Sequence, residues 1–167
     1  ASVRVCQQGS LVDVWLHHAA DRPKEWQRTS GCTGGMTSAQ TDRPAAHPYT
    51  EIKIKPEVLL SGMEQLLQTQ VLYRETGGIH SSAVSDGRAV WVLAEDIGRH
   101  NTIDKLAGKI LFDNLIIDPL ILLTTGRVSS EMLQKSARLG AVVVVSRTSP
   151  TSQSVILAEE AGITLVG

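Results

Sequence analysis

The chain has 167 residues, of which 42% are hydrophobic and 20% charged, and its formal net charge at pH 7 is -1. A chain of this length can bury one sizeable core, so one main domain is expected. The balanced charge offers no basic surplus for nucleic acid, and no apolar run is long enough to cross a bilayer. We therefore expect neither a nucleic-acid partner nor a membrane partner.

The chain has two cysteines, Cys6 and Cys32. Because no secretory leader precedes them, the sequence predicts a cytoplasmic protein whose thiols stay reduced. A structural disulfide between the two residues is the alternative, and it fits that compartment less well.

The first part of the chain is polar and interrupted by glycine and proline. Residues 2–5 and 11–16 are candidate strands, and the residues that follow show little hydrophobic period up to about Tyr49. A segment of this kind inside a compact protein calls for an explanation by function or mobility. We expect a partial β/loop region over residues 1–48, which carries Cys32, and an α/β domain over residues 49–167.

From residue 49 the hydrophobic pattern becomes regular. Residues 51–55 alternate as a strand, and Pro56 then opens a helix whose apolar side chains recur at helical spacing. Asp86-Gly87 is a typical hairpin turn between two strands. The remaining expected elements are strands 81–85, 89–94, 119–124, 141–145 and 163–166, and helices 102–114, 129–139 and 151–161.

This order of elements predicts an α/β fold with helices on both faces of one sheet. Unbroken apolar strands rich in β-branched residues are typical of a sheet that is covered on both faces. Their alternation with helices implies parallel strands joined by right-handed crossovers. The hairpin adds antiparallel strands, so the sheet is expected to be mixed.

Residues 29–36 place the thiol of Cys32 between glycines. Flanking glycines let the backbone bend and leave the thiol open to another protein or a bulky cofactor, which suits a nucleophile or a carrier. A glycine-rich surface turn with an incidental cysteine explains these residues equally well. Gly35 stands where a Cys-x-x-Cys pair would need its second thiol, so a dithiol redox site is excluded.

Residues 75–82 combine two glycines with a histidine. The backbone N–H groups of Gly77 and Gly78 would suit an anion, with His80 beside them. A loop with a satisfied histidine is the simpler interpretation of so short a pattern.

Residues 95–101 follow an apolar strand and precede a helix, which is where α/β proteins place ligands. Asp96 would accept a hydrogen bond from a base or ribose, and Arg99 would pair with a phosphate. His100 would donate or accept near neutral pH. The helix dipole alone would explain acidic residues here, but not Arg99 and His100.

Gly126 and Arg127 stand at the next junction between a strand and a helix. Helix capping explains the neighbouring serines and Glu131, which leaves Arg127 for a phosphate or carboxylate. Arg147 repeats this arrangement at the following junction. Provided that the strands run parallel, Asp96, Arg127 and Arg147 would reach one edge of the sheet and form a binding rim.

Six motifs together resemble the formate dehydrogenase accessory sulfurtransferase family, known as FdhD. The resemblance implies a cytidine-deaminase-like α/β domain that lacks the deaminase zinc, preceded by a mostly β region. The histidines of the chain also show no metal-ligand spacing, so no zinc is expected. The motifs are Ser-Gly-Cys-Thr-Gly-Gly (30–35), Thr-Gly-Gly-Ile-His-Ser-Ser-Ala (76–83), Glu-Asp-Ile-Gly-Arg-His-Asn-Thr-Ile-Asp-Lys (95–105), Thr-Gly-Arg-Val-Ser-Ser-Glu-Met (125–132), Ser-Arg-Thr-Ser-Pro-Thr (146–151) and Gly-Ile-Thr-Leu-Val-Gly (162–167).

The resemblance also implies a function. Proteins of this family take sulfur from a cysteine desulfurase and pass it to the molybdenum bis(molybdopterin guanine dinucleotide) cofactor before the cofactor enters formate dehydrogenase. Cys32 matches the position that carries the persulfide, so the chain is expected to be a sulfurtransferase with little or no independent turnover. The expected partners are the desulfurase, the catalytic subunit of formate dehydrogenase and a second copy of the chain. A guanine nucleotide would mimic the cofactor at Gly77, Gly78, His80, Asp96, Arg99, His100, Gly126 and Arg127.

The sequence departs from the family pattern in two places. Gly35 replaces the second cysteine of the usual Cys-Gly-x-Cys-Gly, so sulfur transfer would depend on one thiol. The family also commonly has a longer N-terminal region and an aromatic and basic tail that helps to bind the cofactor, and the printed sequence includes neither. Two rival functions remain. One is a cofactor-binding chaperone with an incidental thiol, and the other is a nucleotide hydrolase or deaminase, which the absent metal ligands disfavour.

Overall fold

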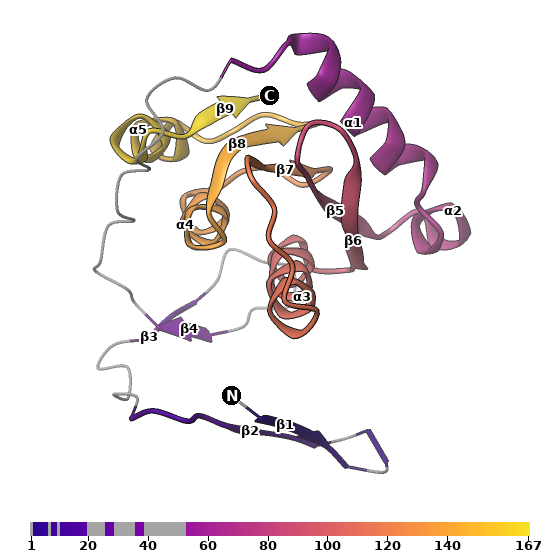
Figure 1. The fold of residues 1–167 in the computed structure, drawn as a ribbon, viewed down its shortest axis with the longest axis vertical. Helices are drawn as coiled ribbons and strands as arrows, with labels where there is room; N and C mark the ends of the chain where they lie inside the picture. The colour runs from indigo at the N-terminus through magenta and orange to yellow at the C-terminus, as the bar shows by residue number, and fades with distance from the viewer. Residues whose placement is uncertain (1, 7, 10, 20–25, 29–35, 39–52) are drawn as a thin grey trace.

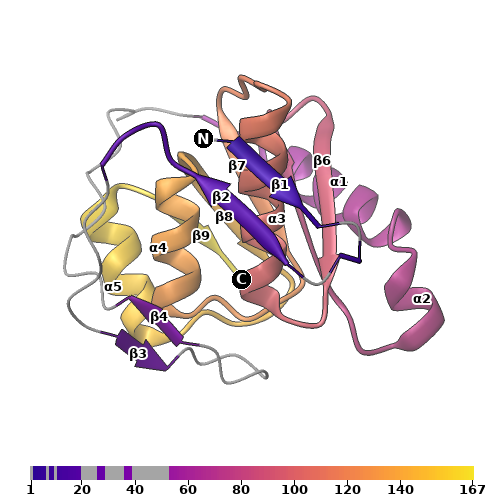
Figure 2. The same cartoon turned by 90° about the horizontal axis from the view of Figure 1, so that it is seen from below.

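The computed structural model describes residues 2–6, 8–9, 11–19, 26–28, 36–38 and 53–167. In the last of these ranges five strands form a mixed sheet in the order β6-β5-β7-β8-β9 (Figure 1). Helices lie on both faces of this sheet (Figure 2). The predicted α/β class and the mixed sheet are therefore confirmed.

The direction of the strands follows from two kinds of connection. The turn at Asp86-Gly87 joins β5 (His80–Ser85) to β6 (Val90–Asp96) as an antiparallel hairpin, and Gly87 has a φ of +84°, which glycine adopts without strain. Helical crossovers join β7 (Leu120–Thr124), β8 (Ala141–Ser146) and β9 (Thr164–Val166) in parallel. Because β5 is also antiparallel to β7, it runs opposite to the other four strands.

The helices pack two separate apolar clusters onto the sheet. Side chains alternate between the faces of a strand, so Ile121 and Leu123 pack with Leu66 on one face, whereas Leu122 packs with Leu106 and Leu133 on the other. The first face is covered by α1 (Pro56–Gln68). The second is covered by α3 (Arg99–Phe112), α4 (Ser130–Arg138) and α5 (Ser152–Ala161).

Helix boundaries largely follow local signals. Pro56 is the first residue of α1, and the side chains of Ser129 and Thr151 cap α4 and α5 by accepting backbone N–H groups. The helix predicted to begin at residue 102 begins at Arg99. The short helix α2 (Leu72–Thr76) was not predicted.

The strand predicted over residues 51–55 is wrong for the three residues that the structure describes, 53–55, which are not in a strand. They lead directly into α1, and Ile54 packs against the apolar cluster below that helix. The alternation of apolar and polar residues here reflects the partial burial of Ile54 under α1, and not the pairing of a strand with a neighbour. Residues 51 and 52 lie outside the described part.

Two antiparallel hairpins belong to the first part of the chain. The two candidate strands are confirmed as β1 (Ser2–Val5) and β2 (Val12–Trp15). They pair with each other, which was not predicted, and their valines face one another as Val3–Val14 and Val5–Val12. The second hairpin, β3 (Trp26–Arg28) with β4 (Met36–Ser38), was not predicted. The expected boundary between residues 48 and 49 lies outside the described residues.

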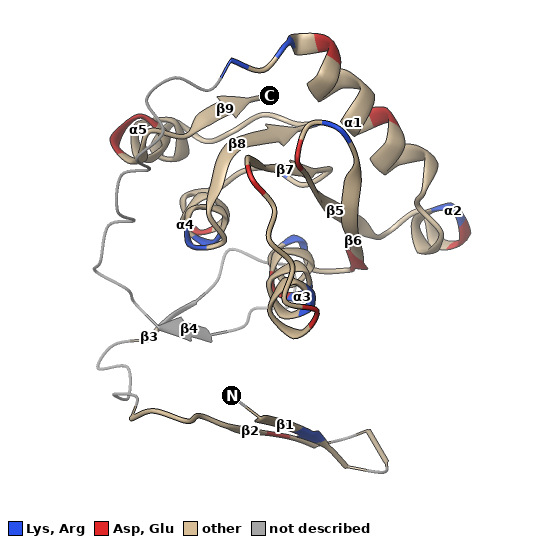
Figure 3. Cartoon of the chain, in the orientation of Figure 1, with Lys and Arg blue, Asp and Glu red and all other residues tan. Residues whose placement is uncertain are grey.

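The distribution of charge and the lengths of the helices characterise the elements further. The neighbouring strands β7 and β8, both in the interior of the sheet, carry no acidic or basic residue (Figure 3). Among the described residues, no helix has both the length and the apolar character that crossing a bilayer requires.

Candidate functional site

One edge of the sheet collects most of the residues that the sequence singles out. Because β6, β7 and β8 run in the same direction, their carboxyl ends reach the same edge, as predicted for Asp96, Arg127 and Arg147. The opposite direction of β5 brings its first residue there as well, since His80 pairs with Asp96 in the register. The Gly77-Gly78 turn that precedes β5 therefore joins this edge.

A pocket of about 540 Å³ opens beside the start of β5. Of the predicted residues, Gly77, Gly78 and His80 line it, together with Arg147 from the rim. Gly77 ends α2 with a φ of +68°, a left-handed conformation that glycine adopts without strain. The rest of the lining is formed by Gln70, Tyr73, Ile79, Thr125 and Thr148.

Gly126 allows Arg99 to approach His80 closely. A Cβ atom on Gly126 would lie 2.8 Å from Cβ of Arg99 and 3.5 Å from Nδ1 of His80, and real Cβ contacts are longer than the first of these distances. The absence of a side chain at Gly126 thus lets the loop after β7 pass between the start of α3 and the start of β5. Arg99 itself is buried.

The charges around His80 favour an anion. Burial lowers the pKa of His80, and the nearby guanidinium groups of Arg99 and Arg127 lower it further. The imidazole is therefore held neutral near pH 7, while the two arginines keep their charge. A phosphate or carboxylate at this position would be stabilised by both guanidinium groups.

Buried hydroxyl groups fix the backbone beneath this edge. Ser82 hydrogen-bonds Thr124 at 2.9 Å and Thr102 at 2.6 Å, and Thr102 in turn donates to the carbonyl oxygen of Arg99 at 2.7 Å. Ser146 donates to the carbonyl oxygen of Gly126 at 2.9 Å. These bonds tie β5, β7, β8 and the first turn of α3 together, so the positions of Arg99 and Gly126 are set by the core.

Asp96 is occupied by groups of its own chain. Its Oδ1 accepts from the backbone N–H of Gly98 at 2.8 Å and from Nδ2 of Asn101 at 2.9 Å, while Oδ2 pairs with Nζ of Lys105 at 2.7 Å. Burial alone would raise the pKa of Asp96, but these partners lower it below its ordinary value. Asp96 thus organises the start of α3, and a base or ribose would have to compete with these contacts.

Glu95 caps α2, a role that the sequence does not reveal. Its carboxylate accepts the backbone N–H groups of Val71 and Leu72, both at 3.0 Å, and of Tyr73 at 3.2 Å. The hydroxyl of Ser81 also donates to it, at 3.2 Å. Because α2 carries Tyr73 and leads into Gly77, this carboxylate helps to fix one wall of the pocket.

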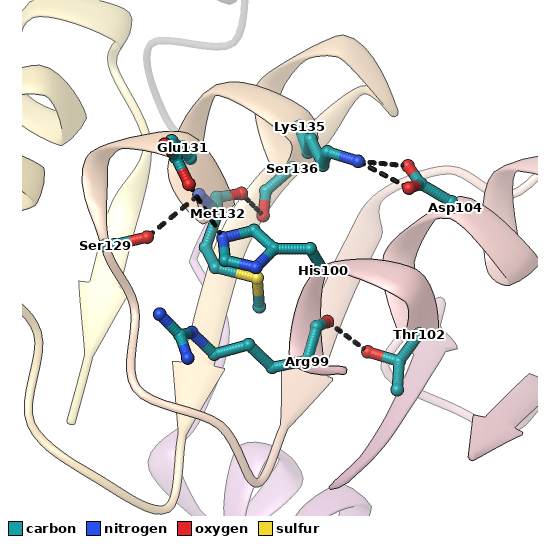
Figure 4. Close-up of polar contacts among 9 residues, drawn as sticks. All are labelled: Arg99, His100, Thr102, Asp104, Ser129, Glu131, Met132, Lys135 and Ser136. Atoms are coloured by element: carbon teal, nitrogen blue, oxygen red, sulfur yellow. Dashed lines mark hydrogen bonds and ion pairs between the residues drawn. The ribbon is translucent and has the colours of Figure 1, made fainter. Parts of the chain in front are cut away.

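His100 lies at the junction of α3 and α4 and not in the pocket. Its Nε2 is 3.1 Å from Oε2 of Glu131, and the two side chains face each other across the junction (Figure 4). Lys135 and Asp104 form an ion pair between the same helices. Burial lowers the pKa of His100, as does the charge of Arg99, while Glu131 opposes the shift. The predicted capping residue Glu131 is therefore also the partner of His100.

A profile of the FdhD/NarQ family matches residues 1–167. The chain belongs to the FdhD/NarQ family. The sulfur carrier protein FdhD of Bacillus subtilis (strain 168) is 36% identical over 128 residues, which cover 77% of this chain and 49% of the relative. That of Staphylococcus aureus (strain MRSA252) is 39% identical over 118 residues, covering 71% and 44%. The chain thus spans about half the length of these curated relatives.

Solved structures agree with the family and the fold. A crystal structure assigned as a formate dehydrogenase accessory protein from Desulfotalea psychrophila superposes with a TM-score of 0.62 at 33% identity, covering 72% of this chain and 51% of that one. The dCMP deaminase of the cyanophage S-TIM5 superposes with a TM-score of 0.51 at 14% identity, covering 68% and 98%. The second match shows the predicted cytidine-deaminase-like fold of this FdhD/NarQ member.

Of the two cysteines of this FdhD/NarQ member, the structure describes Cys6. Cys32, the predicted sulfur carrier, lies outside the described residues. Cys6 is a thiol whose Sγ accepts the backbone N–H of Leu11 at 3.2 Å. Because the disulfide alternative involves Cys32, it stays a prediction.

Some lining residues were missed by sequence reasoning. Gln70 and Tyr73 follow α1 in a segment without a recognisable motif, and no local signal marks them. Thr125 and Thr148 do lie within the motifs that the sequence singles out, but as hydroxyl residues at strand ends they resemble ordinary turn residues. Conversely, Asp96, Arg99, His100, Gly126 and Arg127 lie outside the pocket lining.

Proposed function

We propose that this chain is the cofactor-binding part of a sulfur carrier of the FdhD type. In this proposal it receives sulfur from a cysteine desulfurase on Cys32 and passes it to the molybdenum bis(molybdopterin guanine dinucleotide) cofactor, which is its substrate. The cofactor would then enter formate dehydrogenase in the cytoplasm. The observation that carries the proposal is the grouping of Arg99, Arg127 and His80 around Gly126 in a chain whose relatives are named sulfur carriers.

The charges at the sheet edge fit the phosphate groups of such a substrate. Two guanidinium groups stand beside a neutral imidazole, and Arg147 adds a third on the pocket wall. Arginine is well suited to phosphate because its planar group donates two parallel hydrogen bonds. The backbone of Gly77 and Gly78 can approach a ligand closely, since no heavy atom lies within 4 Å of a Cβ on either residue.

The transfer step would move the outer sulfur of a persulfide from the desulfurase to Cys32. The Cys32 thiolate would attack the outer sulfur of a persulfide on the desulfurase, forming a new S–S bond while the S–S bond of the donor breaks. The donor cysteine leaves as a thiolate and takes up a proton. Since the sulfane sulfur keeps its oxidation state, this step needs no external oxidant or reductant. The protein would be a sulfurtransferase in this limited sense.

The decisive experiment loads the protein with sulfur. The chain is incubated with a cysteine desulfurase and cysteine, and its intact mass is measured before and after treatment with a reductant. Wild-type protein and Cys6→Ala are expected to gain one sulfur that the reductant removes. Cys32→Ala is expected to gain none, while it still binds a guanine nucleotide.

A different pattern would favour the chaperone function. If the wild type binds a guanine nucleotide but gains no sulfur, the carrier role is wrong and the cofactor-binding role remains. If Cys32→Ala is loaded as well as the wild type, the assignment of Cys32 is wrong. Size-exclusion chromatography tests the proposed homodimer. When the catalytic subunit of formate dehydrogenase is added, the same measurement tests that partner.

A further inference from the structure

Gln70 is a buried amide on the wall of the pocket. Only 4% of its surface is exposed, yet it lines the pocket together with His80, Thr125 and Arg147. In the part of the chain that the structure describes, the hydrogen bond of its side chain runs from Nε2 to Oγ of Ser81, at 2.8 Å. Because buried amides normally use both ends, Oε1 is left as an acceptor for a ligand.

The orientation of this amide is set by Glu95. Burial alone would raise the pKa of Glu95, but the backbone N–H groups of residues 71–73 and the hydroxyl of Ser81 lower it below its ordinary value. Glu95 is therefore ionised near pH 7 and can only accept hydrogen bonds.

The hydroxyl of Ser81 has one proton, which it donates to Oε1 of Glu95 at 3.2 Å. Its oxygen is then restricted to accepting, and only the nitrogen end of Gln70 can donate to it. The inverted amide would place two acceptor oxygens against each other at 2.8 Å. Charge at Glu95 thus determines which end of Gln70 remains for the pocket.

We infer that Gln70 is a specificity-determining residue whose Oε1 accepts a hydrogen bond from a ring N–H or amino group of a 2-amino-4-oxo heterocycle. This inference rests on the proposed function, because the guanine and the pterin of the proposed substrate share that ring edge, with adjacent N–H and NH₂ donors. Arg147 and His80, on the same pocket wall, provide for the anionic part of such a ligand.

The acceptor also explains what the pocket would reject. Adenine presents a lone pair at N1, where guanine presents an N–H group, so adenine would set an acceptor against Oε1. A buried polar group that loses its partner costs free energy, which makes such sites selective. We expect wild-type protein to bind GDP roughly tenfold more tightly than ADP, which corresponds to one hydrogen bond.

Isothermal titration calorimetry with GDP, ADP and neopterin tests this role in wild type, Gln70→Met and Gln68→Met. Methionine keeps the length of the side chain and removes the amide. Gln70→Met is expected to lose roughly tenfold in GDP affinity, with little change for ADP, so that the preference disappears. Gln68 is exposed on α1 and serves as the matched control, for which no change is expected. General loosening of the pocket would weaken both nucleotides and leave their ratio unchanged.

A second arm uses only the wild type, so it does not depend on the folding of a variant. Inosine diphosphate lacks the amino group and 1-methyl-GDP lacks the ring N–H. At least one of them is expected to bind roughly tenfold more weakly than GDP. Preferential binding of neopterin, abolished by Gln70→Met, would support the same role and assign the pterin end to it.

The outcomes separate the inference from the proposed function. Equal affinities of the wild type for GDP, inosine diphosphate and 1-methyl-GDP, or a Gln70→Met variant that keeps its preference for GDP over ADP, would overturn the role of Gln70 alone. Failure of wild-type protein to bind any of these nucleotides or neopterin would overturn the proposed cofactor site, and the inference with it.

Discussion

Arg99 and His100 are adjacent in the sequence but lie in two different regions. Arg99 lies close to Gly126 and His80, next to the pocket. His100 faces Glu131 in the junction of α3 and α4. The first region gathers the positive charge of Arg99 and Arg127, and the second joins two helices through the His100–Glu131 contact and the Lys135–Asp104 ion pair. One short motif therefore supplies both a proposed ligand-binding group and a contact between two helices.

Helix geometry explains why the two residues separate. Successive side chains on an α-helix point about 100° apart, so the first two residues of α3 meet different neighbours. The close approach of the loop after β7 then determines that Arg99 lies beside His80. If this division is correct, substitutions on the pocket side should affect binding, whereas those in the α3–α4 junction should affect stability.

The largest effect is expected for Gly126→Val, which joins the two regions. The first added carbon would lie 2.8 Å from Cβ of Arg99, and neither backbone can yield easily because buried hydroxyl groups hold both. Overpacking of this kind costs about 1–3 kcal/mol, and displacement of Arg99 should also weaken phosphate binding. Urea unfolding and GDP titration measure the two losses.

Gly78→Val is the matched control for that substitution. No heavy atom lies within 4 Å of a Cβ at Gly78, so its stability should change little. If Gly126→Val were as stable as Gly78→Val and bound GDP as the wild type does, the close approach of Arg99 to the loop would not be needed for either property.

Next in size is Arg127→Gln, on the pocket side. Loss of one charged partner of a phosphate should weaken GDP binding about tenfold, with a smaller dependence on salt, and leave the free energy of unfolding nearly unchanged. Arg138→Gln, an exposed arginine in the last turn of α4, is the control and should bind as the wild type does. Equal losses in both variants would point to a diffuse charge effect.

Much of the fold was predictable because it depends on local signals and strand burial. Asp86-Gly87 marked the hairpin, and the unbroken apolar runs of β7 and β8 marked buried strands. The sequence could not reveal α2, because its first N–H groups are capped by Glu95 from β6, 22 to 24 residues away. Local propensity carries no information about a cap that tertiary structure brings from elsewhere.

The sheet edge of the candidate site was predictable, whereas the contacts of its residues were less so. Strand direction was enough to bring Asp96, Arg127 and Arg147 to one edge. The same reasoning could not show that Asp96 is occupied by Lys105, or that Glu131 faces His100. These roles depend on side-chain directions at helix starts, where a polar residue can serve either a ligand or the helix itself.

A smaller effect is expected for Glu131→Gln, within the α3–α4 junction. Loss of the charge opposite His100 should cost about 1 kcal/mol of unfolding free energy, with GDP affinity unchanged. Because the pKa of His100 is lowered in the folded state, the unfolded state binds protons more readily, and stability should fall as the pH decreases through about 6.5.

Glu131 opposes that lowering, so its removal should make the fall steeper, although Arg99, Lys135 and Asp104 also act on His100. Urea unfolding between about pH 7.5 and about pH 5.5 tests this sign. A variant with a flatter pH dependence than the wild type, or with weakened GDP binding, would contradict the assignment of Glu131 to the junction.

The smallest expected effect is a change in the pKa values of the two histidines when a ligand binds. It compares the two regions most directly. Burial and Arg99 lower the pKa of both histidines, but Arg127 adds to the lowering at His80, whereas Glu131 opposes it at His100. A bound phosphate beside Arg99 and Arg127 would offset their positive charge, so the pKa of His80 should rise when GDP binds. The pKa of His100, on the junction side, should move less.

Nuclear magnetic resonance follows the ring protons of each histidine against pH, with and without GDP, and His80→Gln and His100→Gln assign the signals. Because the influence of a charge falls with distance, a larger rise at His100 would place the anion nearer the junction. Equal rises would contradict a site beside His80.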